Sequence, residues 1–324
     1  MNNCLVTGAT GFVGRELCCF LRERENVRIK AVSRRSAEGC WDSHFCWDFE
    51  NGALPAAELA GVDTIFHLAG IAHDFRIGPK IDFLYKKVNA DATVMLAEIA
   101  VRQGVKRFVF ASSVKAGGSS PDGICADEEY QGEPDGSYGL TKREAEIKIL
   151  EIGRATGMHV SIIRPALVYG RSVKGNLAMM LRCIDKGWFP PLPDTGNIRT
   201  MVHVYDLVKA LVLAAEKKEA SGEIFIVTDG IRYSSREIFN EMCLAVGRKI
   251  PDWSVPETFF LILARMGDLF GRLGKVPFDT CRYNKLLGDD CYSSTKIQEI
   301  LKFKPEKSLR KALPEMVRAF QNDG

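Results

Sequence analysis

The 324-residue chain has no long hydrophobic run, no large excess of charge of one sign and no cysteine spacing typical of a metal site. Its most apolar stretch, residues 259–264, is far too short to span a bilayer, so we expect no transmembrane segment. The net charge is +3 with scattered basic residues, which argues against a nucleic-acid surface. The chain enters an apolar segment at Cys4, so we expect no signal peptide and a cytoplasmic protein.

Ten cysteines are present, but none forms a Cys-x-x-Cys pair, and eight of them are dispersed. We therefore predict no metal site, and we expect most of the thiols to be small buried side chains in a reducing compartment. The apolar residues of 257–273 predict a helix of the domain core. Peripheral membrane contact through 259–264 with Met266, Leu269 and Phe270 is the alternative.

Short apolar strands alternate with helices along the first half of the chain. This order predicts an α/β fold, a Rossmann-type doubly wound parallel sheet covered on both faces. Residues 1–172 are expected to form the dinucleotide-binding domain, which residues 198–230 rejoin. Residues 173–324 are expected to form mainly a smaller α/β lobe that binds the substrate in the cleft between them.

A glycine pattern, Gly8-x-x-Gly11-x-x-Gly14, follows the first predicted strand and opens the first predicted helix. In this context it indicates a dinucleotide site, because glycines allow a tight turn and the helix N-terminus can hold a pyrophosphate. The second strand ends in Ser33-Arg34-Arg35-Ser36, without the acidic residue typical of NAD sites. Arg34 favours NADP over NAD by binding its 2′-phosphate, unless it only stacks on adenine. Asp48 is a candidate to bind the adenine amino group of the cofactor, and the alternative is that it is an ordinary turn residue.

Tyr138 and Lys142 lie one turn apart if residues 137–147 are helical. The Lys142 ammonium is then expected to favour the phenolate and to lower the pKa of Tyr138. Such a tyrosine can pass a proton to and from a substrate oxygen during hydride transfer.

These motifs, in this order, resemble the extended short-chain dehydrogenase/reductases, the nucleotide-sugar epimerase, dehydratase and reductase group. The resemblance covers essentially the full length and rests on these matches: Thr7–Gly14, His67–Gly70, Asn89 with Thr93, Ser112-Ser113, Tyr138-x-x-x-Lys142, Arg164–Gly170 and Arg199-x-x-Val202-His203-Val204-x-Asp206.

The resemblance implies a role for each matched residue. Ser113 would hold the reacting oxygen, Tyr138 would be the acid/base, and Lys142 would bind the nicotinamide ribose and tune the tyrosine. Asn176 and Arg199 match positions that hold the substrate's diphosphate, with Ser113 and Tyr138 on its sugar, and Asn89 would support the active-site helix. The implied cofactor-binding set is Gly8, Thr10, Gly11, Phe12, Val13, Gly14, Arg34, Asp48, Phe49, Leu68, Ala69, Gly70, Asn89, Lys142 and Pro165.

Two features of the sequence, compared with the family pattern, narrow the range of reactions that we expect. Val114 and Lys115 stand where the dehydratases have Asp-Glu, so dehydration is disfavoured, and Lys115 adds a cation near the site unless it points to solvent. The Ser-Ser-x-Lys run and residues 285–296 resemble the bacterial surface-polysaccharide branch, which contains 4-ketoreductases and 4-epimerases.

The leading hypothesis is an NAD(P)-dependent oxidoreductase acting at C4 of a nucleotide sugar, with UDP as the expected nucleotide, as a 4-ketoreductase or a 4-epimerase. A catalytically silent dinucleotide-binding regulator or interaction protein is the alternative. The resemblance also implies a homodimer that pairs through the helices carrying 89–100 and 138–150, although these apolar faces could equally pack within one subunit.

Overall fold

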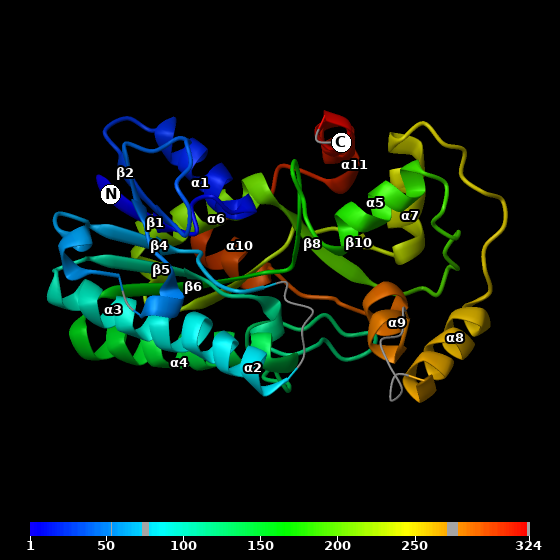
Figure 1. Cartoon of the computed structure of the whole chain (residues 1–324), viewed down its shortest axis with the longest axis horizontal. Coiled ribbons are helices and arrows are strands. Elements are labelled where there is room, and N and C mark those ends of the chain that lie inside the picture. Colours follow the sequence, from blue (N-terminus) through cyan, green and yellow to red (C-terminus); the bar gives the residue numbers. More distant parts are fainter. Residues whose placement is uncertain (53, 73–77, 271–277, 323–324) are drawn as a thin grey trace.

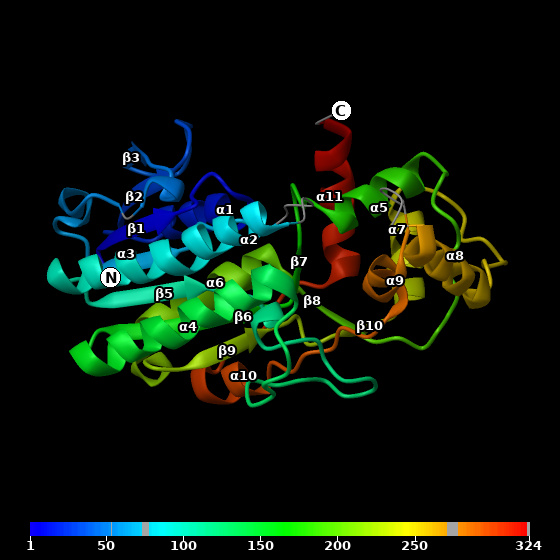
Figure 2. The ribbon, with the colours of Figure 1, turned by 60° about the horizontal axis from the view of Figure 1, so that its bottom comes forward.

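The computed structural model describes every residue except 53, 73–77, 271–277 and 323–324. Figure 1 shows two parts: a sheet flanked by helices that holds the N-terminus, and a smaller lobe built mainly from the second half of the chain. The turned view in Figure 2 shows the same division. None of the described helices is long and apolar enough to cross a membrane.

Seven parallel strands form the large sheet, in the order β3-β2-β1-β4-β5-β6-β9. Residues in the central strands are nearly all buried, because helices cover both faces. The strands are β1 (Asn3–Thr7), β2 (Arg28–Ser33), β3 (Ser43–Cys46), β4 (Thr64–His67), β5 (Arg107–Ala111), β6 (His159–Pro165) and β9 (Ile224–Val227). The expected doubly wound Rossmann sheet is confirmed.

Each face of this sheet has its own hydrophobic core. One core joins the sheet to α1 (Phe12–Arg22), α6 (Val204–Glu216) and α10 (Thr295–Leu301). The other joins it to α3 (Ala92–Arg102) and α4 (Gly136–Thr156). Helix α2 (Pro79–Tyr85) runs through a π-helical segment, Lys86–Asp91, into α3, on the face that also carries α4 (Figure 1).

The smaller lobe contains a three-stranded sheet in the order β10-β8-β7. Its strands are β7 (Leu167–Tyr169), β8 (Arg199–His203) and β10 (Arg232–Tyr233), and its helices are α5 (Asn176–Asp185), α7 (Ser235–Ala245), α8 (Glu257–Phe270), α9 (Thr280–Leu287) and α11 (Leu309–Asn322). The chain returns to the large sheet through α6 and β9, whereas β8 stays in the small sheet.

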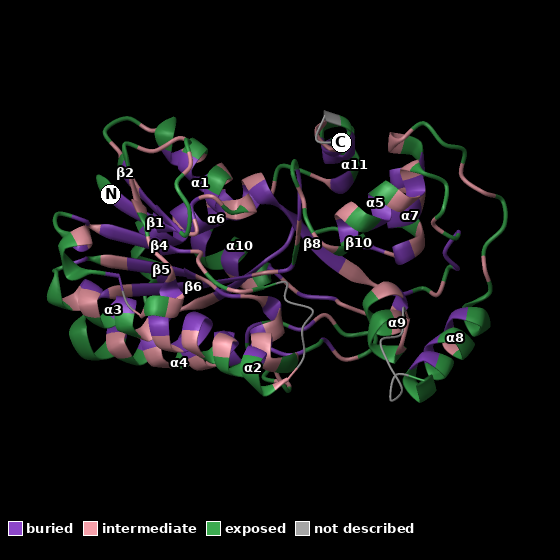
Figure 3. Ribbon diagram, viewed as in Figure 1, coloured by how far each residue is buried: buried purple, intermediate pink, exposed green. Residues whose placement is uncertain are grey.

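Helix α8 joins the core of the smaller lobe on one side only, through the buried Phe260. Only Phe260, Ala264 and Gly267 are buried in it, and its other apolar side chains are largely exposed (Figure 3). The short helix α9 packs against the same side, and Phe260 contacts the ring of Phe278, which precedes α9. Composition could not show this, because it does not reveal how many sides of a helix find a partner.

Two cysteine pairs depart from the expectation of buried free thiols. Cys19 is bonded to Cys40, and Cys125 to Cys291. The second pair joins positions 166 residues apart, a proximity that only the folded chain creates. Cys4, Cys18 and Cys243 are free and buried, as expected of small apolar side chains, and no described group of His, Cys, Asp or Glu is placed to hold a metal ion.

A buried ion pair fixes α4 to the sheet. Arg164, near the end of β6, binds Glu146 of α4 through two hydrogen bonds, Nε to Oε1 at 2.9 Å and Nη2 to Oε2 at 2.5 Å. Both side chains are almost fully buried. Helix α4 also carries Tyr138 and Lys142, so this pair sets where the candidate catalytic helix lies.

Replacing Glu146 by Ala should lower the free energy of unfolding by about 3–5 kcal/mol, because it leaves the Arg164 charge buried without a partner. Urea denaturation measures the change. Glu144→Ala removes a more exposed carboxylate of the same helix, one that pairs with Lys148, and should cost less than about 1 kcal/mol. Equal losses in the two variants would contradict the importance assigned to the buried pair.

Candidate active site

The residues predicted to bind the cofactor lie at the carboxyl ends of the parallel strands. The glycine turn follows β1, Arg34 follows β2, and Leu68, Ala69 and Gly70 follow β4. Ser113 lies two residues after β5, and Pro165 is the last residue of β6. Because the strands are parallel and adjacent, one edge of the sheet presents all of these segments together.

The glycine turn is tight enough to exclude side chains. Gly8 has φ +68°, and a Cβ there would lie 2.9 Å from the Ala69 nitrogen; at Gly14 it would lie 2.2 Å from the Gly8 carbonyl oxygen. Helix α1 begins after Gly11 with no side-chain cap and no acidic residue in its first turn, which holds Phe12 and Val13. Its free N–H groups suit a pyrophosphate, so these residues fit a dinucleotide.

Three of the predicted cofactor residues lie beyond the ends of β2 and β3. Arg34 is exposed there, as a group that meets a 2′-phosphate would need to be. The Asp48 carboxylate accepts a hydrogen bond from the Glu50 nitrogen at 3.0 Å and so caps a short 3-10 helix. Phe49 is buried, and its ring packs edge-on against His67 at 5.5 Å.

A buried hydrogen-bond chain connects β1, β4 and α3. The Thr7 hydroxyl accepts from the Leu68 and Ala69 nitrogens, each at 3.1 Å, so its own proton goes to His67 Nδ1 at 2.7 Å. His67 Nε2 then donates to Thr93 Oγ1 at 2.9 Å, and the Thr93 hydroxyl donates to the Asn89 carbonyl at 2.8 Å.

This chain requires a neutral His67, and burial, reinforced by Lys142, lowers the pKa of His67 to about 3. Sequence reasoning quoted Thr7, His67 and Thr93 within motifs but assigned none of them a function. Their sequence separations of 60 and 26 residues gave no signal of mutual contact.

Asn89 and Lys142 meet beside Gly70. The Asn89 side chain accepts from the Ile71 nitrogen at 2.8 Å and donates to the Ile71 carbonyl at 3.0 Å, which holds the segment after β4 in place. A Cβ on Gly70 would lie 2.9 Å from Asn89 Oδ1 and 3.4 Å from Lys142 Nζ. Asn89 lies in the π-helical segment, a local irregularity often found at functional sites.

Ser113 and Tyr138 come together where α4 begins. Ser113 caps a 3-10 turn by accepting from the Lys115 nitrogen at 3.2 Å, and Gly139 packs so closely that its Cβ would lie 2.4 Å from the Lys115 carbonyl oxygen. Burial raises the pKa of Tyr138 to about 12, and a hydrogen bond with the Ser113 side chain opposes this rise. The two oxygens are therefore neighbours, as a shared role at one substrate oxygen requires.

The expectation that Lys142 lowers the pKa of Tyr138 is wrong for this structure. The Lys142 ammonium donates to the Ala111 carbonyl at 2.9 Å and lies 4.4 Å from the centre of the Phe110 ring. It is directed toward the end of β5, and burial lowers its own pKa to about 8. Helical spacing gave the shared face correctly but could not give the direction of a long flexible side chain.

On the substrate side, one carboxylate joins two cations. Asp290 Oδ1 lies 3.1 Å from Lys115 Nζ, and its Oδ2 lies 3.7 Å from Arg199 Nη2. Lys115 therefore points into the protein and not to solvent, and it also lies 3.4 Å from Asp135. Sequence reasoning did not single out Asp290. Asn176 is the first residue of α5 in the smaller lobe, where it is exposed.

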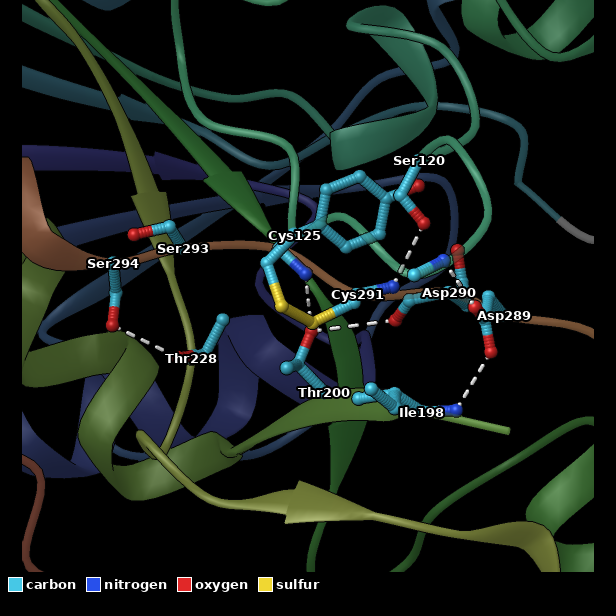
Figure 4. Close-up of a disulfide and its surroundings, with 12 residues drawn as sticks. Ser120, Cys125, Ile198, Thr200, Thr228, Asp289, Asp290, Cys291, Ser293 and Ser294 are labelled. Atoms are coloured by element: carbon cyan, nitrogen blue, oxygen red, sulfur yellow. Dashed lines mark hydrogen bonds between the residues drawn. A yellow bond between two sulfur atoms is a disulfide. The ribbon is translucent and has the colours of Figure 1, made fainter. Parts of the chain in front are cut away.

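The segment around Asp290 connects the two parts of the protein (Figure 4). The Asp290 nitrogen donates to the Ile198 carbonyl at 2.8 Å, and the Thr200 nitrogen donates to the Asp290 carbonyl at 3.0 Å. Its neighbour Cys291 is bonded to Cys125, in the loop that precedes α4. Arg199 is thus held between the smaller lobe and the loop beside Ser113.

Acidification should destabilise the protein through His67. Its folded-state pKa of about 3 lies below the ordinary value of 6.5, so the unfolded chain binds the extra proton and stability is lost as pH falls below 6.5. Between pH 7 and pH 5 this group alone should remove about 2 kcal/mol from the free energy of unfolding.

Urea denaturation at the two pH values, on the wild type and on His67→Gln, measures this loss. The variant should be less stable at pH 7, and its stability should fall by about 2 kcal/mol less on acidification. An identical pH dependence in both proteins would contradict a neutral His67.

Comparison with known proteins agrees with this geometry. The model of the NAD dependent epimerase/dehydratase family matches residues 4–228. A UDP-glucose 4-epimerase of Vibrio cholerae is 32% identical over 98% of this chain and 94% of its own length. The N-acetyl-alpha-D-glucosaminyl-diphospho-ditrans,octacis-undecaprenol 4-epimerase of Escherichia coli O157:H7 is 25% identical over 91% and 88%. The crystal structure of a Thermotoga maritima UDP-glucose 4-epimerase, 22% identical, superposes with a TM-score of 0.78 over 99% of both chains. The chain belongs to the NAD dependent epimerase/dehydratase family of extended short-chain dehydrogenase/reductases.

Proposed function

We propose that the protein is an NAD(P)-dependent oxidoreductase that inverts or reduces C4 of a hexose carried on a diphosphate. The observation that supports this most directly is the meeting of Ser113 and Tyr138 at the strand edge that also carries the glycine turn. A bound nicotinamide dinucleotide would supply or accept the hydride at C4. The protein's own groups then have to hold the C4 oxygen and move its proton.

Tyr138 is the group that moves this proton. In the oxidising direction its phenolate takes the proton of the C4 hydroxyl, and in the reducing direction the phenol returns it to the developing alkoxide. Ser113 holds the same oxygen through its hydroxyl. We expect Lys142, beside Gly70, to turn from the Ala111 carbonyl toward a cofactor ribose when the dinucleotide binds, from where its charge would favour the phenolate.

The diphosphate is assigned to Arg199, supported by Lys115 and, at the start of α5, Asn176. An arginine suits this task because its planar fork can donate two hydrogen bonds to phosphate oxygens. Asp290 balances the two cations until a substrate phosphate provides the opposite charge. The two relatives described above are named for substrates in which a sugar is joined to a diphosphate. The diphosphate belongs to a nucleotide in one substrate and carries a polyprenol in the other.

Epimerisation is the first candidate reaction, because both of these relatives are named 4-epimerases. Reduction of a 4-keto sugar is the second, favoured by Arg34 and the lack of an acid at the end of β2, since a reductase must exchange its cofactor and NADPH is the usual donor. We place either reaction in the synthesis of surface-polysaccharide sugars, with UDP as the expected nucleotide.

A panel of UDP-hexoses and 4-keto UDP-hexoses separates the two reactions. An epimerase should convert a UDP-hexose into its C4 epimer with no net change in NAD(P)H absorbance. A reductase should consume NAD(P)H only with a 4-keto sugar. Dinucleotide binding without turnover of any sugar would instead support the catalytically silent regulator.

Tyr138→Phe should lower kcat by several orders of magnitude, on the order of 10³-fold or more, because it removes the hydroxyl proposed to move the C4 proton. The Kd for the dinucleotide, measured by fluorescence titration, should stay near the wild-type value. Tyr205→Phe, on α6, is the matched control and should keep full activity. Near-normal turnover in Tyr138→Phe would remove the catalytic assignment.

Arg199→Met should raise KM for a UDP-sugar by about 10- to 100-fold, the loss expected for a charge-assisted contact to phosphate. Initial-rate kinetics with the same panel measure it. Dinucleotide affinity should be unchanged, which separates a lost substrate contact from a damaged fold. An unaltered KM would show that the diphosphate binds elsewhere.

A further inference from the structure

Three buried polar atoms on the side of the sheet that α4 covers have no hydrogen-bond partner among the residues that the structure describes. They are Ser112 Oγ, Arg164 Nη1 and Arg143 Nη2. The Arg164 residue is 1% exposed and Ser112 is 4% exposed. Buried polar atoms in folded proteins are nearly always paired, with the chain itself or with a bound water or ion. Three such atoms close together therefore indicate a common partner that is not part of the chain.

The backbone brings the three side chains to one place. The Ser112 nitrogen donates to the Ile163 carbonyl at 2.8 Å, which continues the pairing of β5 with β6 and sets Ser112 beside Arg164. The residues two positions before each of them belong to the core shared with α4, and side chains alternate along a strand, so both point toward α4. Arg143 lies on α4 itself and reaches the same region from the other side.

Arg143 and Arg164 meet at the turn that follows Ser113. Arg143 Nε donates to the Ala116 carbonyl at 2.6 Å, and a Cβ on Gly117 would lie 3.0 Å from Arg164 Nη1. The two guanidinium groups therefore contact consecutive residues of one turn. Because Gly117 has no side chain, it leaves the Arg164 Nη1 atom free to meet another group.

This region carries an excess of positive charge. Glu146 is the carboxylate that acts on both arginines, and both of its oxygens accept hydrogen bonds from Arg164. The pKa of Arg143 is lowered, first by burial and then by the Arg164 charge, and the opposing effect of Glu146 is smaller. Two guanidinium groups and one carboxylate leave one positive charge without compensation.

The chemistry of the unpaired atoms limits what can bind between them. Guanidinium N–H groups can only donate, so the partner has to accept from both arginines, and the Ser112 hydroxyl can donate to it as well. A water molecule would accept these bonds but would leave the excess charge in place. A monovalent anion accepts the bonds and also compensates the charge, which lowers the cost of burying it.

We propose that Ser112, Arg143 and Arg164 bind a small monovalent anion, with chloride as the candidate ion, behind the turn that carries Ser113. Arg143 is partly exposed and gives the ion a route from solvent. The bound ion joins α4, β6 and this turn, and so stabilises the position from which Ser113 acts. The inference concerns the binding of an ion alone and is independent of the proposed reaction.

Thermal unfolding of the purified full-length protein in sodium chloride and in sodium gluconate, at equal ionic strength, tests the site. Chloride should raise Tm along a saturable curve, by about 2–4 °C at ten times its Kd, whereas the large gluconate ion should not. Arg143→Gln should remove this difference, because it takes away one donor and the excess charge. Arg154→Gln makes the same change at an exposed position of α4 and should respond to chloride like the wild type.

Ser112→Ala provides a second variant that keeps both arginines and their ion pair with Glu146. It should weaken the affinity for chloride by about fivefold, the loss expected for one hydrogen bond, without abolishing the response. A crystal grown with sodium bromide in place of chloride should show an anomalous difference peak between the Arg143 and Arg164 guanidinium groups.

Four results would overturn the proposal. The first is the same Tm of the wild type in chloride and gluconate, and the second is an undiminished chloride response in Arg143→Gln. The third is an equal loss of that response in the Arg154→Gln control, which would make it a general effect of surface charge. The fourth is density without an anomalous signal at this place in the bromide crystal, which would assign the three polar atoms to an ordered water.

Discussion

The site depends on the buried hydrogen-bond chain that runs from Thr7 through His67 and Thr93 to the backbone of Asn89. Each group in it has one available role: Thr7 accepts from two backbone nitrogens and must donate to His67, which must donate onward. The chain therefore fixes His67 as neutral and ties the ends of β1 and β4 to α3. With those ends fixed, the glycine turn and the segment after β4 approach so closely that a side chain at Gly8 is excluded.

A second constraint acts through α4. The buried Arg164–Glu146 pair joins that helix to β6, and the close approach of Gly139 to the turn at Ser113 joins it to the end of β5. Tyr138 directly precedes Gly139, so these two attachments fix the first turns of α4 and bring the Tyr138 hydroxyl to Ser113. Burying an ion pair costs desolvation free energy. Removing one partner destabilises the fold strongly, because it leaves the other charge buried without compensation, whereas an apolar pair of similar size in its place is often neutral. Its use here is consistent with a helix whose position matters for function.

The smaller lobe contributes to the site through residues 288–291. Residues 288–291 contact β8, the loop carrying Cys125 and the cation of Lys115, so the arginine proposed for the diphosphate is positioned by both parts of the protein. The same segment continues back into α9, which supports α8. The proposed diphosphate site is thus linked to the packing of α8 through α9 and the residues that follow it.

The sequence by itself determined the parallel sheet, the dinucleotide turn and the shared helical face of Tyr138 and Lys142, because glycine spacing, apolar strands and helical periodicity are local signals. It could not determine the direction of the Lys142 side chain, the partners of Thr7 and Asp290, or the Cys125–Cys291 bond, since these join residues far apart in the chain. It also did not show that α8 is buried on one side only, because periodicity reports an apolar face without saying whether anything covers it. Only the tertiary structure decided these points, because burial and long-range contacts exist only once the chain is folded.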